Sequence, residues 1–149
     1  MKVLFICTAN LCRSAAAEKL LRHYGAGAGF EARSRGTAAA PGAGMPSAVR
    51  DFLSAAGVQD LGHRPELVME ADIGWADLVL VMEDHHYEAV AERFPQAMRK
   101  MHLFLDFCAG AGEAGLEDPA GKSRAVFDRV LSAVDAAVKA LVARKGLPA

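Results

Sequence analysis

The sequence predicts an α/β domain in which helices cover both faces of a parallel sheet. Two runs, Lys2–Cys7 and Asp77–Met82, are nearly continuous in Val, Leu and Ile, which is typical of strands buried on both faces. Segments with helical spacing alternate with the short apolar runs, and this alternation favours a parallel sheet. The 149 residues, of which 52% are hydrophobic and 23% charged, suit one domain that we expect to span residues 1–149.

Local signals bound the predicted elements. The first helix, Ser14–Tyr24, is rich in Ala and Leu and stops before Gly25, a common C-terminal cap. The second starts with Ser47 as its N-cap, the third ends before Pro95, and the last carries a single apolar stripe. Strands are thus expected at Lys2–Cys7, Phe30–Ser34, Asp77–Met82 and Lys100–Phe107, and helices at Ser14–Tyr24, Ser47–Ala56, Asp84–Phe94 and Ser123–Lys145.

Composition excludes several classes of function. The formal net charge of -1 gives no bulk attraction to nucleic acid or to an anionic membrane, so we expect neither as a partner. The three cysteines are too few, and odd in number, to frame a secreted disulfide-rich module, which favours a cytoplasmic protein. Arg13 interrupts the N-terminal apolar run before it is long enough for a signal peptide or a membrane span.

One segment carries most of the chemical information: Cys7-Thr8-Ala9-Asn10-Leu11-Cys12-Arg13-Ser14. It follows a predicted buried strand and opens a predicted helix, and ligands of open parallel sheets bind beyond the carboxyl ends of the strands. Such a loop points backbone N–H groups into one concavity, with the positive end of the helix dipole behind them. We therefore predict an anion site of phosphate size with Cys7 at its floor.

Three side chains of this segment predict covalent phosphoryl transfer. The helix start and the nearby Arg13 favour the thiolate form of Cys7, the nucleophilic form of a cysteine. Ser14 can donate its hydroxyl to the sulfur and stabilise the anion further. The guanidinium of Arg13 can bind two phosphate oxygens at once.

Two long loops are expected to border the site. Gly36–Met45 and Ala109–Gly121 are rich in Gly or Ala, and long loops of small α/β domains often carry function. Phosphoryl transfer to a cysteine also needs an acid that protonates the leaving oxygen. Asp118, held out of helical geometry by Pro119 in the second loop, is the candidate for that acid.

The Cys-x5-Arg-Ser segment after an N-terminal strand, the distant Asp-Pro pair and the chain length together resemble the low-molecular-weight protein tyrosine phosphatases. The resemblance covers nearly the whole chain and implies a single three-layer domain with a four-stranded parallel sheet flanked by helices. It implies a phosphomonoester hydrolase that forms a phosphocysteine intermediate. The implied substrate is a phosphorylated protein (phosphotyrosine) or a small phosphomonoester, with no metal and no cofactor.

The resemblance also assigns roles to individual residues. It implies that Cys7, Arg13 and Asp118 are catalytic, and that Asn10 holds the loop in shape through a network of supporting residues. Cys12 matches a second loop cysteine that can form a reversible disulfide with Cys7 and shield it from irreversible oxidation. The implied phosphate-binding residues are Thr8, Ala9, Asn10, Leu11, Cys12, Arg13 and Ser14, and the implied supporting residues are Ser14, Asn10, Ser34 and His63.

The chain departs from the family pattern at the loop and at the pocket walls. Ala9 replaces the usual Gly, which predicts a slightly altered loop geometry. Ala120-Gly121 replaces two tyrosines after the Asp-Pro pair, and Ala40 or Pro41 replaces the aromatic residue of a second wall. Because stacking on these aromatics is lost, we expect weak binding of phosphotyrosine and loose selectivity.

Leu11 bears on a sibling activity. Related protein arginine phosphatases carry Thr at this position, whereas Leu11 resembles the apolar residue of the tyrosine-directed members. Two alternatives stay open. An arsenate reductase of the same fold needs resolving cysteines near the middle of the chain, and Met82–Val90 contains none. A non-catalytic phosphate-binding module would require that Ala9 and the altered acidic loop prevent turnover.

The pair His85-His86, beside Glu83 and Asp84, invites a metal hypothesis. Adjacent histidines on a helix point to different faces, and no spaced cysteines follow them. We therefore expect a solvated helix start here and no metal site.

Overall fold

A computed structural model of the protein describes residues 1–39, 41–110, 112 and 115–144. The strands form one parallel sheet in the order β2-β1-β3-β4. The predicted α/β class with four parallel strands is therefore confirmed. The strands are β1 (Lys2–Cys7), β2 (Glu31–Gly36), β3 (Leu78–Val81) and β4 (Met101–Leu103), and the helices are α1 (Arg13–Tyr24), α2 (Ser47–Ala55), α3 (Glu70–Trp75), α4 (Asp84–Arg93), the 3-10 helix η1 (Pro95–Lys100), α5 (Phe104–Ala109) and α6 (Arg124–Ala143).

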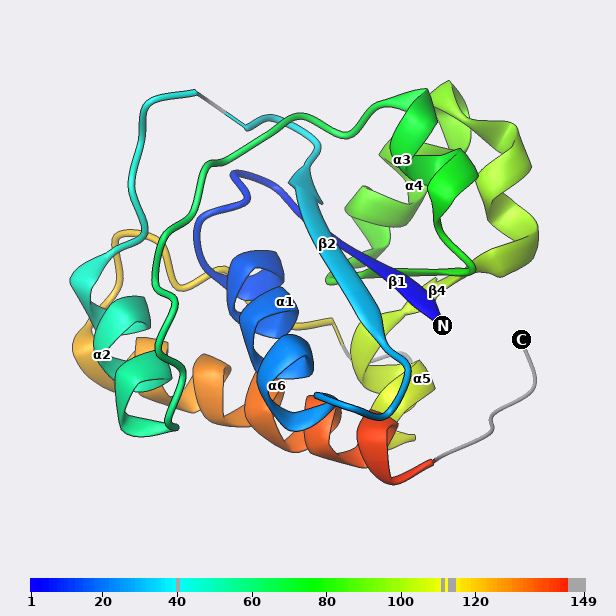
Figure 1. Ribbon diagram of the computed structural model, residues 1–149. Helices are drawn as coiled ribbons and strands as arrows, with labels where there is room; N and C mark the ends of the chain where they lie inside the picture. Colours follow the sequence, from blue (N-terminus) through cyan, green and yellow to red (C-terminus); the bar gives the residue numbers. More distant parts are fainter. Residues whose placement is uncertain (40, 111, 113–114, 145–149) are drawn as a thin grey trace.

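Helices lie on both faces of the sheet (Figure 1). Helices α1, α2, α5 and α6 cover the face on which Val3 and Phe5 point, and α3, α4 and η1 cover the face of Leu4 and Ile6. Successive side chains of a strand point to opposite faces, so a strand buried on both sides must be apolar at every position. This explains the continuous apolar run of β1.

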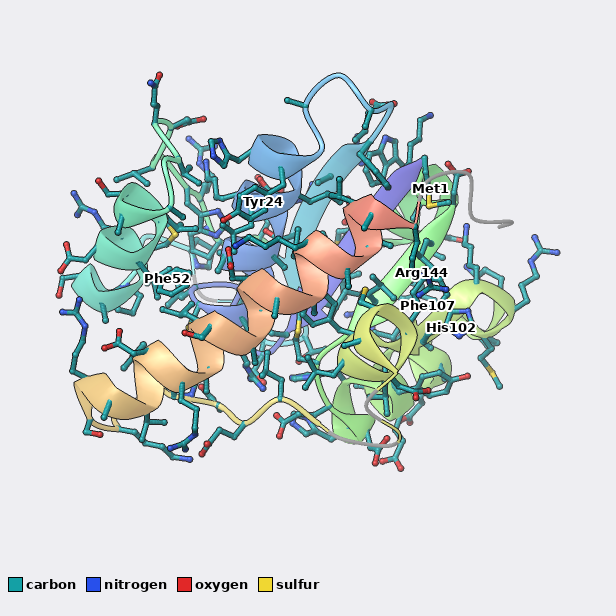
Figure 2. The ribbon with its side chains drawn as sticks, turned by 90° about the horizontal axis from the view of Figure 1, so that it is seen from below. Met1, Tyr24, Phe52, His102, Phe107 and Arg144 are labelled. Carbon is teal, nitrogen blue, oxygen red and sulfur yellow. The ribbon has the colours of Figure 1, made fainter. Side chains whose placement is uncertain are left out.

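Helix α6 runs along the first face of the sheet, beside α1 (Figure 2). Its apolar stripe contributes Val130, Val134 and Leu141 to the core. At the end of α1, the Tyr24 hydroxyl donates a 2.6 Å hydrogen bond to Asp135 Oδ1 of α6. The long C-terminal helix therefore closes this face and fixes the position of α1, whose start belongs to the predicted anion loop.

The predicted strand Lys100–Phe107 is wrong beyond Leu103, where the chain turns into α5. Burial there follows helical spacing, since Phe104 and Cys108 are buried while Asp106 between them is exposed. A short apolar run fits a strand or a helix equally well, and packing decides between them. Helices α3 and η1 were absent from the predicted elements.

The other boundaries lie close to the predicted ones, with instructive differences at the caps. Helix α2 begins at Ser47, but Pro46 occupies the N-cap and no side chain caps the helix, so the predicted role of Ser47 is wrong. Gly25 does follow α1, but its φ of -92° is not left-handed. A Cβ at this position would lie 2.7 Å from Leu21 O, so the glycine is needed to avoid a steric clash. The predicted end of the last helix at Lys145 lies outside the described residues.

Among the described helices, none combines the length and the apolar character that a membrane crossing requires.

Candidate active site

The loop after β1 is held at the carboxyl end of the sheet by backbone contacts with the chain that follows β2. Thr37 N donates to Cys7 O (2.9 Å) and Ala38 N donates to Thr8 O (3.0 Å). A Cβ on Gly36 would lie 2.4 Å from Thr8 O, so a glycine is needed where β2 passes the loop this closely. The Cys7 side chain is buried at this point, 3% exposed.

Asn10 sets the shape of the loop. It is fully buried and has a left-handed backbone (φ 60°), a conformation that Asn tolerates better than most residues. Its side-chain oxygen accepts from Glu66 N (3.0 Å), and its carbonyl oxygen lies 2.6 Å from His63 Nε2. The left-handed residue of the loop is Asn10 and not Ala9, so position 9 does not use the positive φ that a glycine would permit.

Ser14 connects Asn10 to the sulfur of Cys7. The Asn10 amide donates to Ser14 Oγ (2.9 Å), and Ser14 Oγ lies 2.9 Å from Cys7 Sγ. Since the hydroxyl oxygen already accepts from Asn10, its own hydrogen is available for the sulfur, and a hydrogen bond of this kind favours the thiolate. The alternative acceptor, Arg35 O, is more distant at 3.4 Å.

Ser34 has a different place from the one the resemblance implied. Its hydroxyl donates to Glu18 Oε1 of α1 (2.6 Å). Ala32, Ser34 and Gly36 are the buried residues of β2, and alternation along the strand turns their side chains toward the same face. Ser34 therefore supports the buried carboxylate of α1, and among the described residues no hydrogen bond joins its side chain to Asn10.

The guanidinium of Arg13, which is 2% exposed, connects three parts of the site. Its Nη1 donates to Glu83 Oε2 and to Leu116 O, each at 2.7 Å. Both hydrogens of Nη1 are then used, while the edge formed by Nε and Nη2 keeps its donors for two phosphate oxygens. Nη2 also lies 3.8 Å from Asp118 Oδ2.

Glu83, at the N-cap of α4, is a functional candidate that sequence reasoning missed. Burial by itself raises the pKa of its carboxyl, but hydrogen bonds from Arg13 and His85 outweigh burial and hold that pKa below its usual value. Glu83 is thus an anion that orients Arg13. No local pattern signals this role, because the two residues are 70 positions apart and meet only through the sheet.

Cys12 differs from Cys7 in its chemistry. Burial, together with the nearby Cys7 and Asp118, outweighs the attraction of Arg13 and raises the pKa of Cys12 to about 12. Cys12 therefore remains a thiol at neutral pH, so it is a poor nucleophile in the resting site. All three cysteines are free thiols in the structure.

A cavity of about 120 Å³ opens above the loop. Its side walls are apolar and come from Leu11, Pro46 and Phe127, of which the last two were missed by sequence reasoning. Phe127 fits the apolar stripe of α6, so its spacing gave no sign that it faces a pocket. The complete lining is Cys7, Thr8, Ala9, Leu11, Cys12, Arg13, Pro46, Asp118, Ala120 and Phe127.

Of the two alternatives for the second wall, Ala40 or Pro41, the structure describes only Pro41, which does not line this cavity. Ala40 lies outside the described residues, and Pro41 borders a separate hollow with His63 and Arg64. Pro46, at the N-cap of α2, does line the cavity.

Asp118 stands at the mouth of the cavity with its side chain half exposed. Its Oδ1 accepts from Ala120 N (3.0 Å), which fixes the turn around Pro119. The loop is tied to the sheet by the hydrogen bond from Leu116 N to Met82 O (2.9 Å). The predicted acid and Cys7 thus line the same cavity.

The start of α4 is solvated only in part, since Asp84 and His85 are exposed as we expected but the next residue is not. His86 is fully buried, and its ring centroid lies 4.0 Å from that of His85. Ligand atoms of Glu83, His85 and His86 lie within 4.8 Å of one another, as a metal site would require. However, His86 Nδ1 accepts from Glu83 N (3.1 Å) and its Nε2 is 2.8 Å from Thr8 Oγ1, so both ring nitrogens already have partners within the protein.

What the cavity can do follows from its floor and its rim. Cys7 offers a sulfur nucleophile and Arg13 a cation to a bound anion, and Asp118 offers a carboxyl group to a leaving oxygen. A parallel α/β sheet that carries such a cavity at the carboxyl end of β1 suits a protein that binds and transfers a phosphate-sized anion.

Comparison with known proteins identifies the family. Residues 2–147 match the family described as low molecular weight phosphotyrosine protein phosphatase, and the chain belongs to this family. A protein-arginine-phosphatase of Geobacillus stearothermophilus is 33% identical over 120 residues, which cover 80% of this chain and 79% of that protein. The low molecular weight protein-tyrosine-phosphatase Wzb of Escherichia coli is 31% identical over 136 residues, which cover 89% and 87% of the two chains.

The fold comparison agrees with the sequence comparison. The solved structure of a low molecular weight protein tyrosine phosphatase from T. tengcongensis has a TM-score of 0.88 and 29% identity, and covers 97% of this chain and 99% of that chain. The protein is therefore a phosphatase of this family, whose members include proteins named for phosphotyrosine and for phosphoarginine.

Proposed function

We propose that the protein hydrolyses phosphomonoesters through a phosphocysteine at Cys7. The Cys7 thiolate attacks phosphorus, the bond from phosphorus to the ester oxygen breaks, and Asp118 protonates the leaving oxygen. Arg13 and the backbone N–H groups of the loop hold the remaining phosphoryl oxygens. Water then attacks the phosphocysteine while Asp118 accepts its proton, and inorganic phosphate leaves with the thiolate restored.

The observation that carries this proposal is the pairing of Cys7 with Ser14 in a cavity that Arg13 also lines. The 2.9 Å contact between Cys7 Sγ and Ser14 Oγ supports an anionic sulfur, and the donors left on Arg13 support binding of an oxyanion next to it. Asp118, 3.8 Å from Arg13 Nη2, is close enough to reach the leaving side of the same anion.

For the substrate, we propose an aryl phosphate of the phosphotyrosine type. Leu11, Pro46 and Phe127 supply apolar walls of the kind that a phenyl ring needs. Phe127 modifies our expectation of weak binding, because one aromatic wall can recover about 0.5–1.5 kcal/mol of stacking. Ala120 leaves part of the mouth without an aromatic residue, so selectivity is expected to be moderate.

Phosphoarginine is the second candidate substrate. It is favoured by the 33% identity to a protein-arginine-phosphatase. Against it, Leu11 offers no hydroxyl to the polar guanidinium where related arginine phosphatases carry Thr. An arsenate reductase is less well supported, since Cys108 is buried in α5 and burial raises the pKa of its thiol to about 12.

A substrate panel tests the choice between the two phosphatase activities. We expect kcat/KM to be higher for a phosphotyrosine peptide than for a phosphoarginine peptide, and we expect Leu11→Thr to raise the value for phosphoarginine. A wild-type protein that prefers phosphoarginine would contradict the substrate assignment and leave the cysteine mechanism intact.

Hydrolysis of nitrophenyl phosphate tests the mechanism. Cys7→Ser should abolish turnover, while Cys108→Ser, a matched change of a buried cysteine in α5, should preserve it. Rapid alkaline quenching during turnover should trap phosphorus on Cys7, because a phosphocysteine is labile in acid and survives in alkali. A phosphorus-free protein under these conditions would contradict the phosphocysteine, and a wild-type protein without turnover would favour the non-catalytic binding module.

We also propose that the protein acts in the cytoplasm. The three free thiols support this, since disulfides are rare in that reducing compartment.

A further inference from the structure

His86 occupies a position that fixes which of its ring nitrogens carries the hydrogen. It lies in the first turn of α4, where its Nδ1 accepts from the backbone N–H of Glu83 at the N-cap (3.1 Å). Burial, together with the nearby His85 and Arg13, lowers the pKa of His86 to about 3, so the ring is neutral at neutral pH. A neutral imidazole has one acceptor and one donor, and since Nδ1 accepts, Nε2 bears the hydrogen.

This hydrogen determines the direction of the Thr8 hydroxyl. His86 Nε2 lies 2.8 Å from Thr8 Oγ1, so the ring donates and the hydroxyl oxygen accepts. The hydroxyl hydrogen of Thr8 must then point elsewhere. Among the hydrogen bonds formed by the described residues, none uses it, and Thr8 lines the cavity next to Cys7.

We propose that the Thr8 hydroxyl donates a hydrogen bond to the bound phosphoryl group, and that His86 is a positioning residue that directs this donor. The inference rests on the proposed function, because it concerns the same phosphate site. A threonine without this partner can turn either a hydrogen or a lone pair toward the cavity, and a lone pair repels the oxygens of a phosphate. The His86 N–H removes the second option before the ligand binds, which is preorganisation of a donor.

The contact also completes a symmetrical support of the loop by α4. Glu83 holds Arg13 at the end of the phosphate loop, and His86, one helical turn further, holds Thr8 at its beginning. The first turn of α4 thus contacts the side chains of Thr8 and Arg13, which lie at the two ends of the loop. A shift of α4 would therefore disturb phosphate binding at both ends of the loop.

Four single variants separate the donor from its support. Thr8→Val keeps the shape of the side chain and removes the hydroxyl, while Thr8→Ser keeps the hydroxyl. His86→Asn places its side-chain oxygen near the position of Nδ1, so it can still accept from Glu83 N, but it is too short to reach Thr8. His102→Asn, an exposed position in β4, is the matched control for the change of residue type.

The measurement is the Kd of inorganic phosphate by calorimetry on the folded full-length protein. A hydrogen bond to a charged group predicts that Thr8→Val weakens phosphate binding at least about tenfold. His102→Asn should bind phosphate as the wild type does, Thr8→Ser should recover most of the binding that Thr8→Val loses, and His86→Asn should bind phosphate more weakly than the wild type. Because His86 acts through Thr8, the double variant Thr8→Val/His86→Asn should be no weaker than Thr8→Val alone.

Two results would overturn the inference: unchanged phosphate binding in Thr8→Val, or effects of the two changes that multiply fully in the double variant. Loss of stability alone cannot produce the expected pattern, since Kd is measured on folded protein and the coupling between the two sites is specific. Turnover of nitrophenyl phosphate by the wild type, measured alongside, reports separately on the proposed function. If the wild type turns over its substrate but all variants bind phosphate with the same Kd, the role of Thr8 is refuted. If the Kd values follow the expected pattern but the wild type shows no turnover, only the proposed hydrolase activity is refuted.

Discussion

Replacing Glu83 by Gln removes the charge that balances Arg13 and changes little else. Arg13 is 2% exposed and Glu83 27% exposed, and the atoms that join them, Nη1 and Oε2, are 2.7 Å apart. The change keeps a neutral acceptor of nearly the same shape. It therefore isolates what the negative charge contributes to the ligand-free site.

The size of the effect follows from the geometry. A hydrogen bond between charged groups stabilises a protein by roughly 1.5–3 kcal/mol, and charge-assisted bonds are roughly twice as strong as neutral ones. The Gln variant should thus lose about 1–2 kcal/mol of unfolding free energy, with the lower value favoured because Asp118 remains 3.8 Å from Arg13. For a domain of this size the loss corresponds to a fall in Tm of roughly 2–8 °C.

Phosphate should reverse part of this loss, because a bound dianion supplies the charge that Glu83 no longer provides. The assay is thermal unfolding in phosphate-free buffer and again at saturating phosphate, where the gap between the two proteins should narrow. Glu117→Gln is the matched control, since Glu117 pairs with Lys122 and Arg129 at the surface and should have little effect. Equal Tm values without phosphate, or a gap that widens with it, would refute the role of Glu83.

Three further predictions follow from the described contacts. The pKa of His86 is lowered from an ordinary 6.5 to about 3 in the folded protein, so between these pH values the unfolded chain binds more protons than the folded one. The free energy of unfolding should therefore fall as pH falls through this window, by up to roughly 1.4 kcal/mol per pH unit. Denaturant titrations should show that slope reduced in His86→Asn and kept in His102→Asn; an unchanged slope would exclude His86 as its source. Asp118→Asn should slow hydrolysis of an alkyl phosphate by roughly 10²–10⁴-fold and that of nitrophenyl phosphate much less, since a good leaving group needs little protonation; equal losses on both would argue against Asp118 as the acid. Phe127→Leu should lower the ratio of kcat/KM for aryl over alkyl phosphate by roughly 2- to 10-fold, whereas Phe52→Leu, which alters another half-buried ring on the same core (Figure 2), should leave that ratio unchanged; a constant ratio in Phe127→Leu would remove Phe127 from the binding wall.

The sequence by itself determined those features that depend only on residues close together in the chain. The apolar run of β1 predicts a strand buried on both faces, because its alternate side chains meet two different helix layers. The loop from Cys7 to Ser14 predicts an anion site because a strand end, a helix start and the reactive side chains fall within one short segment. Both are local properties, and the structure places the elements where the patterns put them.

Only the tertiary structure decided which distant groups complete the site. The order β2-β1-β3-β4 sets β3 beside β1, so the residues that follow these two strands meet, and this brings Glu83 to Arg13 and His86 to Thr8. Periodicity gives the faces of a strand but not its neighbours in the sheet. The same limit explains the turn into α5 at Phe104, where the sequence allows a strand or a helix and the ring settles against Phe5 at a centroid distance of 5.7 Å.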